Sequence, residues 1–237
     1  MAARITYLSI DRPELQFAAK ELMRRMARPT AADETRLKRV GRFLATHPRL
    51  VLRFEWSELP EHLDVYVDSD FAGCCRTRKS TTGGVCMLGG ACLKTWSRTQ
   101  ATLALSSGEA ELAAAVKGAT EGLGVVALLA DFGCVVRCRL RSDATAAIGM
   151  VQREGLGRVR HLAVSDLWIQ QRVRRGDISV SKWLGTENPS DMGTKAIEAA
   201  SMKAHLNRPN FFFESGRSPA APQLRSEAGR VAQTLVP

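Results

Sequence analysis

The stretch that decides the fold runs from Val65 to Phe71 and reads Val-Tyr-Val-Asp-Ser-Asp-Phe. Its alternating apolar residues predict a strand, and two carboxylates, Asp68 and Asp70, stand where that strand runs out. A carboxylate inside a buried strand is costly unless something compensates its charge. We therefore expect Asp68 to anchor a divalent metal site, with Asp70 as a turn residue that supports it.

The segments around this strand predict an α/β (α+β) fold, with a mixed five-stranded sheet flanked by helices. The first three strands are antiparallel, and Gly89-Gly90 is a two-residue hairpin signal between the second and third. Strand–helix crossovers follow, and they place helices on both faces of the sheet. The predicted strands are Leu63–Phe71, Gly83–Leu88, Cys92–Arg98, Val135–Ser142 and Ile178–Leu184, and the predicted helices are 106–131, Ala144–Gln152, Leu162–Arg174 and Pro189–Ala200.

Pattern and composition divide the chain into residues 1–60, 61–200 and 201–237. The first part reads as basic and helical, with one helix starting near Arg12-Pro13 and another opened by Thr30 or Asp33. Two helices alone make a thin core, so we expect them to pack on the sheet domain or on another part of the protein. The last part reads as an extension and tail, disordered from about Ser215.

The formal net charge is +10, which favours a polyanionic partner, with nucleic acid as the first candidate and a solvated basic surface as the alternative. The six cysteines show no CxxC pair and no histidines at zinc spacing, so we expect reduced thiols in an intracellular protein, cytoplasmic or nuclear and not secreted. The apolar runs are too short to suggest a membrane span, and the N-terminus lacks an apolar signal core.

Glu111 is predicted to point at the sheet. Ser106 and Glu109 form a capping box, which places Glu111 about one turn inside the helix. Glu111 shares a helix face with a stripe of small residues, which allows the helix backbone to approach the sheet closely. The stripe consists of Ala115, Gly118, Ala119 and Gly122.

Two further acids, Asp143 and Asp191, have simpler interpretations when each is taken alone. Asp143 ends a strand and suits a helix N-cap, and Asp191 sits near a helix start, where the dipole favours acids. Together with Asp68 and Glu111, however, they stand at the ends of strands and helices that can meet at one edge of the sheet. Clustered carboxylates need cations, and oxygen-only ligands suit Mg²⁺ or Mn²⁺. Two such ions about 3.5–4 Å apart can activate a water and stabilise a leaving oxygen in phosphodiester hydrolysis.

The sequence resembles the reverse transcriptase–ribonuclease H portion of Pol polyproteins from copia-type LTR retrotransposons. Each matching segment is short, but they occur in the family's order and span roughly residues 3–198. They are Tyr7–Ala18, Val67–Gly73, Arg78–Gly84, Thr95–Gln100, Leu105–Glu111, Ser142–Ile148, Arg160-His161 and Pro189–Lys195.

The resemblance implies a ribonuclease H fold that cleaves the RNA strand of an RNA–DNA hybrid with two Mg²⁺ ions. It carries the family's four acidic positions onto Asp68, Glu111, Asp143 and Asp191. It also makes residues 1–60 the end of the reverse transcriptase thumb/connection region, so the rest of the reverse transcriptase is an expected partner. The polymerase aspartates are not recognisable, so we expect no DNA synthesis.

The chain departs from the family at two places. The usual Asp-Asn-Gln is Asp143-Ala144-Thr145 here, which removes amides that could contact the hybrid. The acid that usually follows His161 by two residues is Ala163. His161 is a candidate for product release or phosphate contact, with a capping or core role as the alternative.

Basic and hydroxyl side chains provide candidate nucleic-acid contacts. Lysine and arginine would hold phosphates, and the hydroxyls would reach the minor groove, where 2′-hydroxyls mark RNA. The candidates are Arg76, Arg78, Lys79, Ser80, Thr81, Arg158, Arg160 and His161.

Two functions fit these observations. The first is an active metal-dependent endoribonuclease on RNA–DNA hybrids, which the presence of all four acids favours. The second is a catalytically inactive, domesticated or decaying retroelement fragment that serves as a nucleic-acid-binding or structural module. The adjacent Cys74 and Cys75, the missing amides and the tail are compatible with the second.

Overall fold

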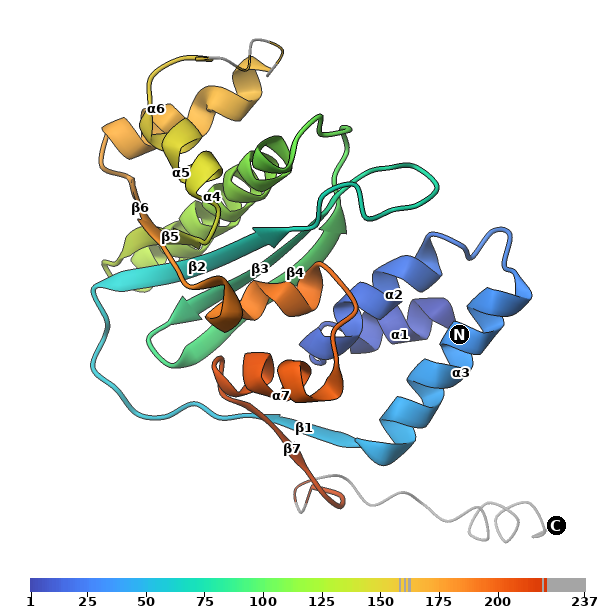
Figure 1. Cartoon of the computed structure of the whole chain (residues 1–237). Coiled ribbons are helices and arrows are strands. Elements are labelled where there is room, and N and C mark those ends of the chain that lie inside the picture. Colours follow the sequence, from blue (N-terminus) through green and yellow to red (C-terminus); the bar gives the residue numbers. More distant parts are fainter. Residues whose placement is uncertain (158, 160, 162, 219, 221–237) are drawn as a thin grey trace, which may run out of the picture.

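A mixed five-stranded sheet, ordered β4-β3-β2-β5-β6, forms the centre of the molecule (Figure 1). The computed structural model describes residues 1–157, 159, 161, 163–218 and 220. Strand β2 is central, antiparallel to β3 and parallel to β5, while β3–β4 is an antiparallel hairpin and β5–β6 a parallel pair. The predicted fold class is therefore confirmed. The strands of this sheet are β2 (His62–Ser69), β3 (Thr81–Leu88), β4 (Ala91–Thr99), β5 (Arg137–Ser142) and β6 (Ile178–Lys182).

Helices cover both faces of the sheet and a separate helical group lies beside its β4 edge (Figure 1). The α-helices are α1 (Ala2–Leu8), α2 (Gln16–Met23), α3 (Ala31–Thr46), α4 (Ser107–Asp131), α5 (Thr145–Gln152), α6 (Trp168–Arg174) and α7 (Ala199–Asn207). Short 3₁₀ turns are η1 (Pro13–Leu15), η2 (Val164–Leu167), η3 (Gly185–Glu187) and η4 (Pro189–Gly193).

Helix α4 packs closely on one face of β2 and β5, as its stripe of small residues predicts. A Cβ atom at Gly118 would collide with Cγ1 of Val67, and one at Gly122 would lie 2.7 Å from Cγ2 of Val65. Because β2 alternates, Val65 and Val67 face α4, whereas Tyr66 faces the opposite layer. The close approach brings the N-terminal end of α4, and with it Glu111, to the end of β2.

The opposite face is covered by η4 and α7, whose Met192 and Leu206 pack with Tyr66 of β2. A glycine is required at position 83 of β3, because a Cβ atom there would collide with the carbonyl oxygen of Ser190. This contact seats η4 directly on the sheet. Asp191 therefore lies at the same end of the sheet as β2's last residues.

The helices α1, α2 and α3 form a small core of their own around Ile5, Leu15 and Leu22. The predicted N-cap Thr30 is confirmed, with Asp33 completing a capping box. Two side chains of α2 connect this group to the sheet: Gln16 Nε2 donates to Thr95 Oγ1 at 2.7 Å and Lys20 Nζ to Thr81 Oγ1 at 2.7 Å. The helical segment thus packs on the sheet domain, one of the two arrangements that its thin core predicts.

The structure corrects three parts of the sequence-based assignment. The segment 1–60 is not entirely helical, because Arg49–Leu52 form a strand, β1, which pairs with β7 (Phe211–Glu214). That pairing also gives ordered structure to the start of the extension 201–237. The predicted helix Pro189–Ala200 is wrong: the 3₁₀ turn η4 ends at Gly193, and α7 begins only at Ala199. The predicted tail lies mostly outside the described residues.

Two further expectations are refined. The helix predicted over Leu162–Arg174 consists, in its described part, of η2 followed by α6. The expectation that no apolar run suits a membrane needs correction, because α4 is the one described helix long and apolar enough to span a bilayer by length and composition. Core helices of α/β sheets meet the same criterion, and α4 buries Ala110, Leu112 and Ala115 in this fold.

The close packing of α4 predicts opposite effects of one substitution at two glycines of that helix. Gly118→Ala should destabilise the fold, since overpacking costs about 1–3 kcal/mol and exceeds the helix-propensity gain of about 1 kcal/mol. Gly124→Ala should stabilise it by about 0.5–1 kcal/mol, because Gly124 is exposed and a Cβ atom there meets nothing within 4 Å. Denaturant unfolding measures both, and equal stability of the two variants would contradict the packing.

Candidate metal centre

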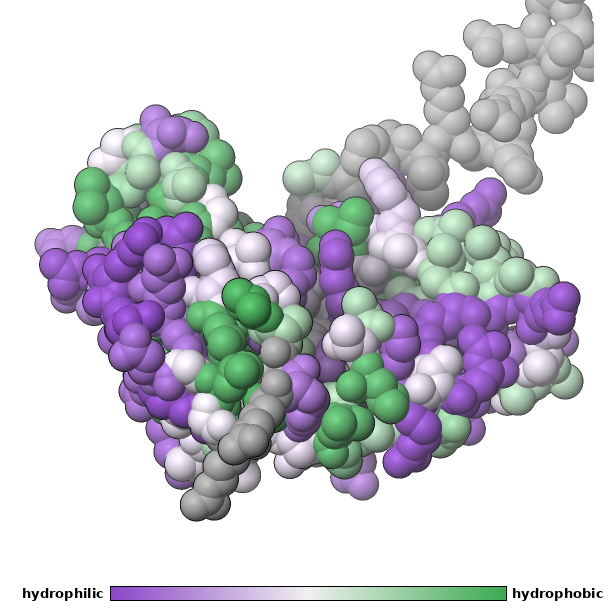
Figure 2. Space-filling view, turned by 90° about the horizontal axis from the view of Figure 1, so that it is seen from above, coloured by the Kyte–Doolittle hydropathy of each residue, from purple (hydrophilic) through white to green (hydrophobic). Residues whose placement is uncertain are grey.

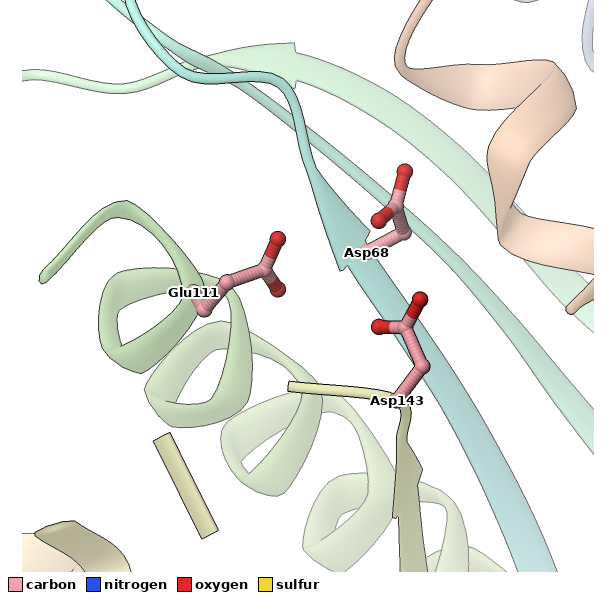
Figure 3. A group of neighbouring side chains, drawn as sticks. All are labelled: Asp68, Glu111 and Asp143. Carbon is pink, nitrogen blue, oxygen red and sulfur yellow. The ribbon is translucent and has the colours of Figure 1, made fainter. Parts of the chain in front are cut away.

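Three carboxylates from three different elements point into one space at the end of β2 (Figure 3). Asp68 is in β2, Glu111 in the first turns of α4, and Asp143 directly after β5. One oxygen of each lies within 4.8 Å of the others. Strands β2 and β5 are parallel neighbours, so both end at the same edge of the sheet. The structure therefore brings together three of the four acids that the sequence predicts to meet.

Asp68 is buried, with 7% of its surface exposed. Thr194, fully buried, donates its hydroxyl to Asp68 Oδ2 at 2.6 Å. Burial raises the pKa of Asp68 to about 7, and the neighbouring charge of Asp191, together with a hydrogen bond between these two carboxyl groups, adds to the increase. In the absence of a cation, Asp68 is thus protonated far more readily than an ordinary aspartate.

Glu111 has one engaged oxygen and one without a partner. Its Oε1 accepts a hydrogen bond from the backbone N–H of Ser69 at 3.2 Å, while its buried Oε2 has no hydrogen-bond partner among the described residues. Burial, followed by repulsion from Asp68 and Asp143, raises the pKa of Glu111 to about 9. A buried oxygen without a donor, facing two other carboxylates, is the environment of a cation ligand. The residues present therefore fit Mg²⁺ or Mn²⁺.

Asp143 has no hydrogen bond that would explain it as a helix cap. The N-cap of α5 is Ala144, and no side chain caps that helix. The capping interpretation of Asp143 is therefore wrong, and its carboxylate is available to the cluster.

Asp191, the fourth predicted acid, lies beside Asp68 on the η4 side of the centre. Its Oδ2 is 2.7 Å from Nζ of Lys195, and it is not in the tight group formed by the other three. The nearby carboxylates raise the pKa of Lys195, although its partial burial opposes this. Lys195 thus supplies part of the positive charge that the acidic centre requires.

Sequence reasoning missed the residues that hold η4 against β2. Asn188, fully buried, donates from Nδ2 to the Val67 carbonyl at 2.9 Å and accepts from the Ser190 N–H at 3.2 Å. With Thr194, it fixes the position of the Asp191 segment. The sequence feature that could have indicated this role is the run Asn-Pro-Ser-Asp, because an Asn before Pro is typical of the start of a turn.

Asp70 stabilises the turn between β2 and β3, as predicted for it. Its carboxylate accepts a hydrogen bond from the backbone N–H of Thr81, and its own N–H donates to the Thr81 carbonyl at 3.1 Å. Asp70 therefore does not join Asp68 in the cluster.

The predicted nucleic-acid contacts fall into exposed and buried groups. Arg76 and Arg78 are exposed, and Lys79 donates to the Ala101 carbonyl. Ser80 and Thr81 are buried and use their hydroxyls inside the protein, where Ser80 accepts from the Ala72 N–H and Thr81 from Lys20. Contact of these residues with nucleic acid stays a prediction.

The remaining candidates follow α5. His161 is exposed, with Nε2 at 3.0 Å from Oε2 of Glu109, so it lies near the start of α4. Desolvation by burial opposes ionisation of Glu109, but the hydrogen bond with His161 outweighs it and lowers the pKa of Glu109. Arg158 and Arg160 lie outside the described residues.

Comparison with known proteins gives the following relatives. No protein-family model matches the chain. The retrovirus-related Pol polyprotein from transposon TNT 1-94 of Nicotiana tabacum is 30% identical over 192 residues, which are 78% of this chain and 14% of that polyprotein. The corresponding polyprotein from transposon RE2 of Arabidopsis thaliana is 27% identical over 201 residues, or 81% and 13% of the two chains. This chain therefore spans about a seventh of these relatives.

Among solved structures, LC11-RNase H1 in complex with an RNA/DNA hybrid is 14% identical, covering 56% of this chain and 93% of its own, with a TM-score of 0.40. The sequence relatives match about four fifths of the chain, a larger share than this solved structure covers. Retrovirus-related Pol polyproteins from copia-type transposons are therefore homologues of this chain, and the match fits a reverse transcriptase–ribonuclease H segment of them.

Proposed function

We propose that this chain hydrolyses the RNA strand of RNA–DNA hybrids in a metal-dependent reaction that serves retrotransposon reverse transcription. The observation that carries the proposal is the convergence of Asp68, Glu111 and Asp143, with a buried Glu111 oxygen that lacks a donor. The net charge of +10 supports a polyanionic substrate, and the homology to Pol polyproteins supports the substrate class.

Two Mg²⁺ or Mn²⁺ ions would be held by Asp68, Glu111, Asp143 and Asp191. When bound, such ions activate a water and stabilise the leaving oxygen of the phosphodiester. Thr194 orients Asp68 through its hydroxyl, and Asn188 keeps η4 in place beside it. Lys195 sits next to Asp191, where its charge also suits a substrate phosphate.

Residues 1–60 are proposed to be the end of a reverse transcriptase thumb/connection region, followed by a ribonuclease H domain over 61–200. The rest of the reverse transcriptase is then a partner, and the site of action is inside the cell, in cytoplasm or nucleus, without a membrane. A catalytically inactive fragment that binds nucleic acid or serves as a structural module is the second candidate, and the replacement at Ala144 and Thr145 favours it.

The proposal predicts hybrid cleavage that depends on Asp68. Asp68→Asn should lower the cleavage rate at least about 100-fold, since even residues that only support metal ligands contribute about 10–100-fold. The measurement uses a labelled RNA–DNA hybrid with Mg²⁺, and RNA and DNA duplexes as controls. The matched variant is Asp131→Asn, at the exposed far end of α4, which should cleave like wild type. If the wild-type chain cleaves the hybrid no faster than Asp68→Asn, the hydrolase proposal is wrong and the catalytically inactive fragment is the better explanation.

Thr194 should act as a positioning residue. Thr194→Val removes the hydroxyl that Asp68 accepts, so cleavage should fall by about 10–100-fold. The Mg²⁺ concentration for half-maximal activity should rise at the same time, which a purely structural role would not cause. Thr194→Ser keeps the hydroxyl and should restore both values most of the way. An unchanged Mg²⁺ requirement in Thr194→Val would argue against the positioning role.

The raised pKa values of Asp68 and Glu111 predict how stability depends on pH without metal. The folded state holds these protons more tightly than the unfolded state, so the stability contributed by these two groups is fully present at low pH and is lost as pH rises through about 7 for Asp68 and about 9 for Glu111. Mg²⁺ should therefore raise Tm more at pH 9 than at pH 5.5. Thermal unfolding with EDTA or Mg²⁺ tests this, and in Glu111→Gln the pH dependence should be weaker. An equal Mg²⁺ effect at both pH values would contradict a metal centre here.

A further inference from the structure

We infer that a groove between α2, α3 and the loop after β2 binds successive backbone phosphates of a nucleic-acid duplex that passes over the metal centre. This inference rests on the proposed function, because it assigns a second contact region to the same substrate. The groove has a volume of about 500 Å³. Its basic lining residues, which we call the arginine groove, are Arg24, Arg25, Arg36, Arg39 and Arg76.

Two of these arginines are already neutralised. Arg24 pairs with Glu21 at 3.1 Å and also donates to Cys74 Sγ at 2.7 Å, while Arg36 pairs with Asp33 at 2.6 Å. The carboxylates that line the groove, Glu21 and Asp70, are likewise engaged. Glu21 also pairs with Lys20, and Asp70 accepts from the Thr81 backbone.

The other three arginines carry the charge available to a ligand. Within the described part of the chain, Arg25, Arg39 and Arg76 have no carboxylate oxygen within 4.0 Å. Arg39 and Arg76 are exposed, and Arg25 is half-buried. Arg25 lies in the turn after α2, Arg39 in α3 and Arg76 in the loop after β2, so they surround the groove from three segments. Such an arrangement complements several phosphates along a backbone, because guanidinium groups bind each phosphate with fixed geometry.

The groove lies next to the metal centre. Its lining includes Asp70, two residues after Asp68, and Ala196, which directly follows the Lys195 that pairs with Asp191. The floor is apolar, with Phe17, Leu22 and Val40 among its residues. A strand whose phosphodiester reaches the acids can therefore continue into the groove, with its sugars over the apolar floor.

The surface on the side of the three N-terminal helices mixes hydrophilic and hydrophobic residues (Figure 2). Figure 2 shows hydrophilic residues spread over the right-hand half, where α1 to α3 lie in Figure 1, with hydrophobic residues between them. A duplex backbone repeats its charge along its length, so it can contact arginines that are spread over three segments, which one small anion cannot do.

Binding of a labelled RNA–DNA hybrid in EDTA tests the groove without cleavage. Arg25→Gln with Arg39→Gln should weaken binding and reduce the slope of log K against log salt by about 0.9 for each lost phosphate contact. The matched control is Lys38→Gln, since Lys38 neighbours Arg39 but is exposed, pairs with Glu34 and does not line the groove. Affinity and slope of Lys38→Gln should equal those of wild type. Wild-type affinity and slope in the arginine variant would overturn the inference.

Cys74 supplies a second readout, because its thiol lies in the groove wall. Desolvation opposes ionisation of this thiol, but hydrogen bonds from Thr77 and Arg24 outweigh it and lower its pKa to about 6. The hybrid should slow alkylation of Cys74 by N-ethylmaleimide, read by peptide mass spectrometry, and should not slow that of Cys134, beyond the end of α4. Protection that persists undiminished in the arginine variant would overturn the inference, as would equal protection by inorganic phosphate.

These outcomes separate the inference from the proposed function. If the wild-type chain binds the hybrid through the arginines but does not cleave it, the proposed enzyme activity is wrong and the groove inference stands. If cleavage of the hybrid depends on Asp68 but hybrid affinity is unchanged by the substitutions at Arg25 and Arg39, the groove inference is wrong and the proposed enzyme activity stands.

Discussion

Repulsion between carboxylates at the end of β2 is the constraint on which the rest of this structure depends. Asp68 and Glu111 are both withdrawn from water, and neighbouring acids oppose their ionisation further: Asp191 that of Asp68, and Asp68 with Asp143 that of Glu111. Only protons or cations can relieve this repulsion, and the ammonium group of Lys195, which contacts Asp191, supplies one positive charge. The centre is thus built for positive charge that arrives from outside the chain.

The scaffold around the acids keeps that unfavourable arrangement in place. Small residues let α4 approach β2, and Gly83 lets η4 approach β3, so the sheet end is clamped from both faces. The buried hydrogen bonds of Asn188 and Thr194 then tie η4 to β2 itself. Because these contacts surround Asp68, the acids cannot separate to relieve their repulsion without unpacking the core.

Local patterns could predict most of the site, and tertiary contacts explain the remainder. Strand alternation located Asp68, and the capping box with the small-residue stripe located Glu111, because both signals act within a few residues. Local patterns could not show that the helix predicted over Pro189–Ala200 stops at Gly193. The Gly193 carbonyl accepts a hydrogen bond from the hydroxyl of Ser97 in β4, which is far away in sequence. The β1–β7 pair likewise joins residues about 160 positions apart, and a four-residue strand carries almost no local signal.

The balance between an active and a decayed chain can be argued from the cost of the acids. A domain that only binds nucleic acid or serves as a structural module would be more stable with an amide side chain at position 111. Oε2 of Glu111 has no hydrogen-bond donor in the described structure, and the charges of Asp68 and Asp143 repel its own charge. The hydrogen bond that Glu111 Oε1 accepts from the Ser69 N–H needs an oxygen acceptor, which an amide would also provide, and not a charge. The acidic centre and the arginine groove are instead explained together by a bound polyanion. Its phosphates would contact the arginines, and cations would lie between its phosphates and the carboxylates of the centre. The charge distribution of the whole site therefore favours the hydrolase over the inert module.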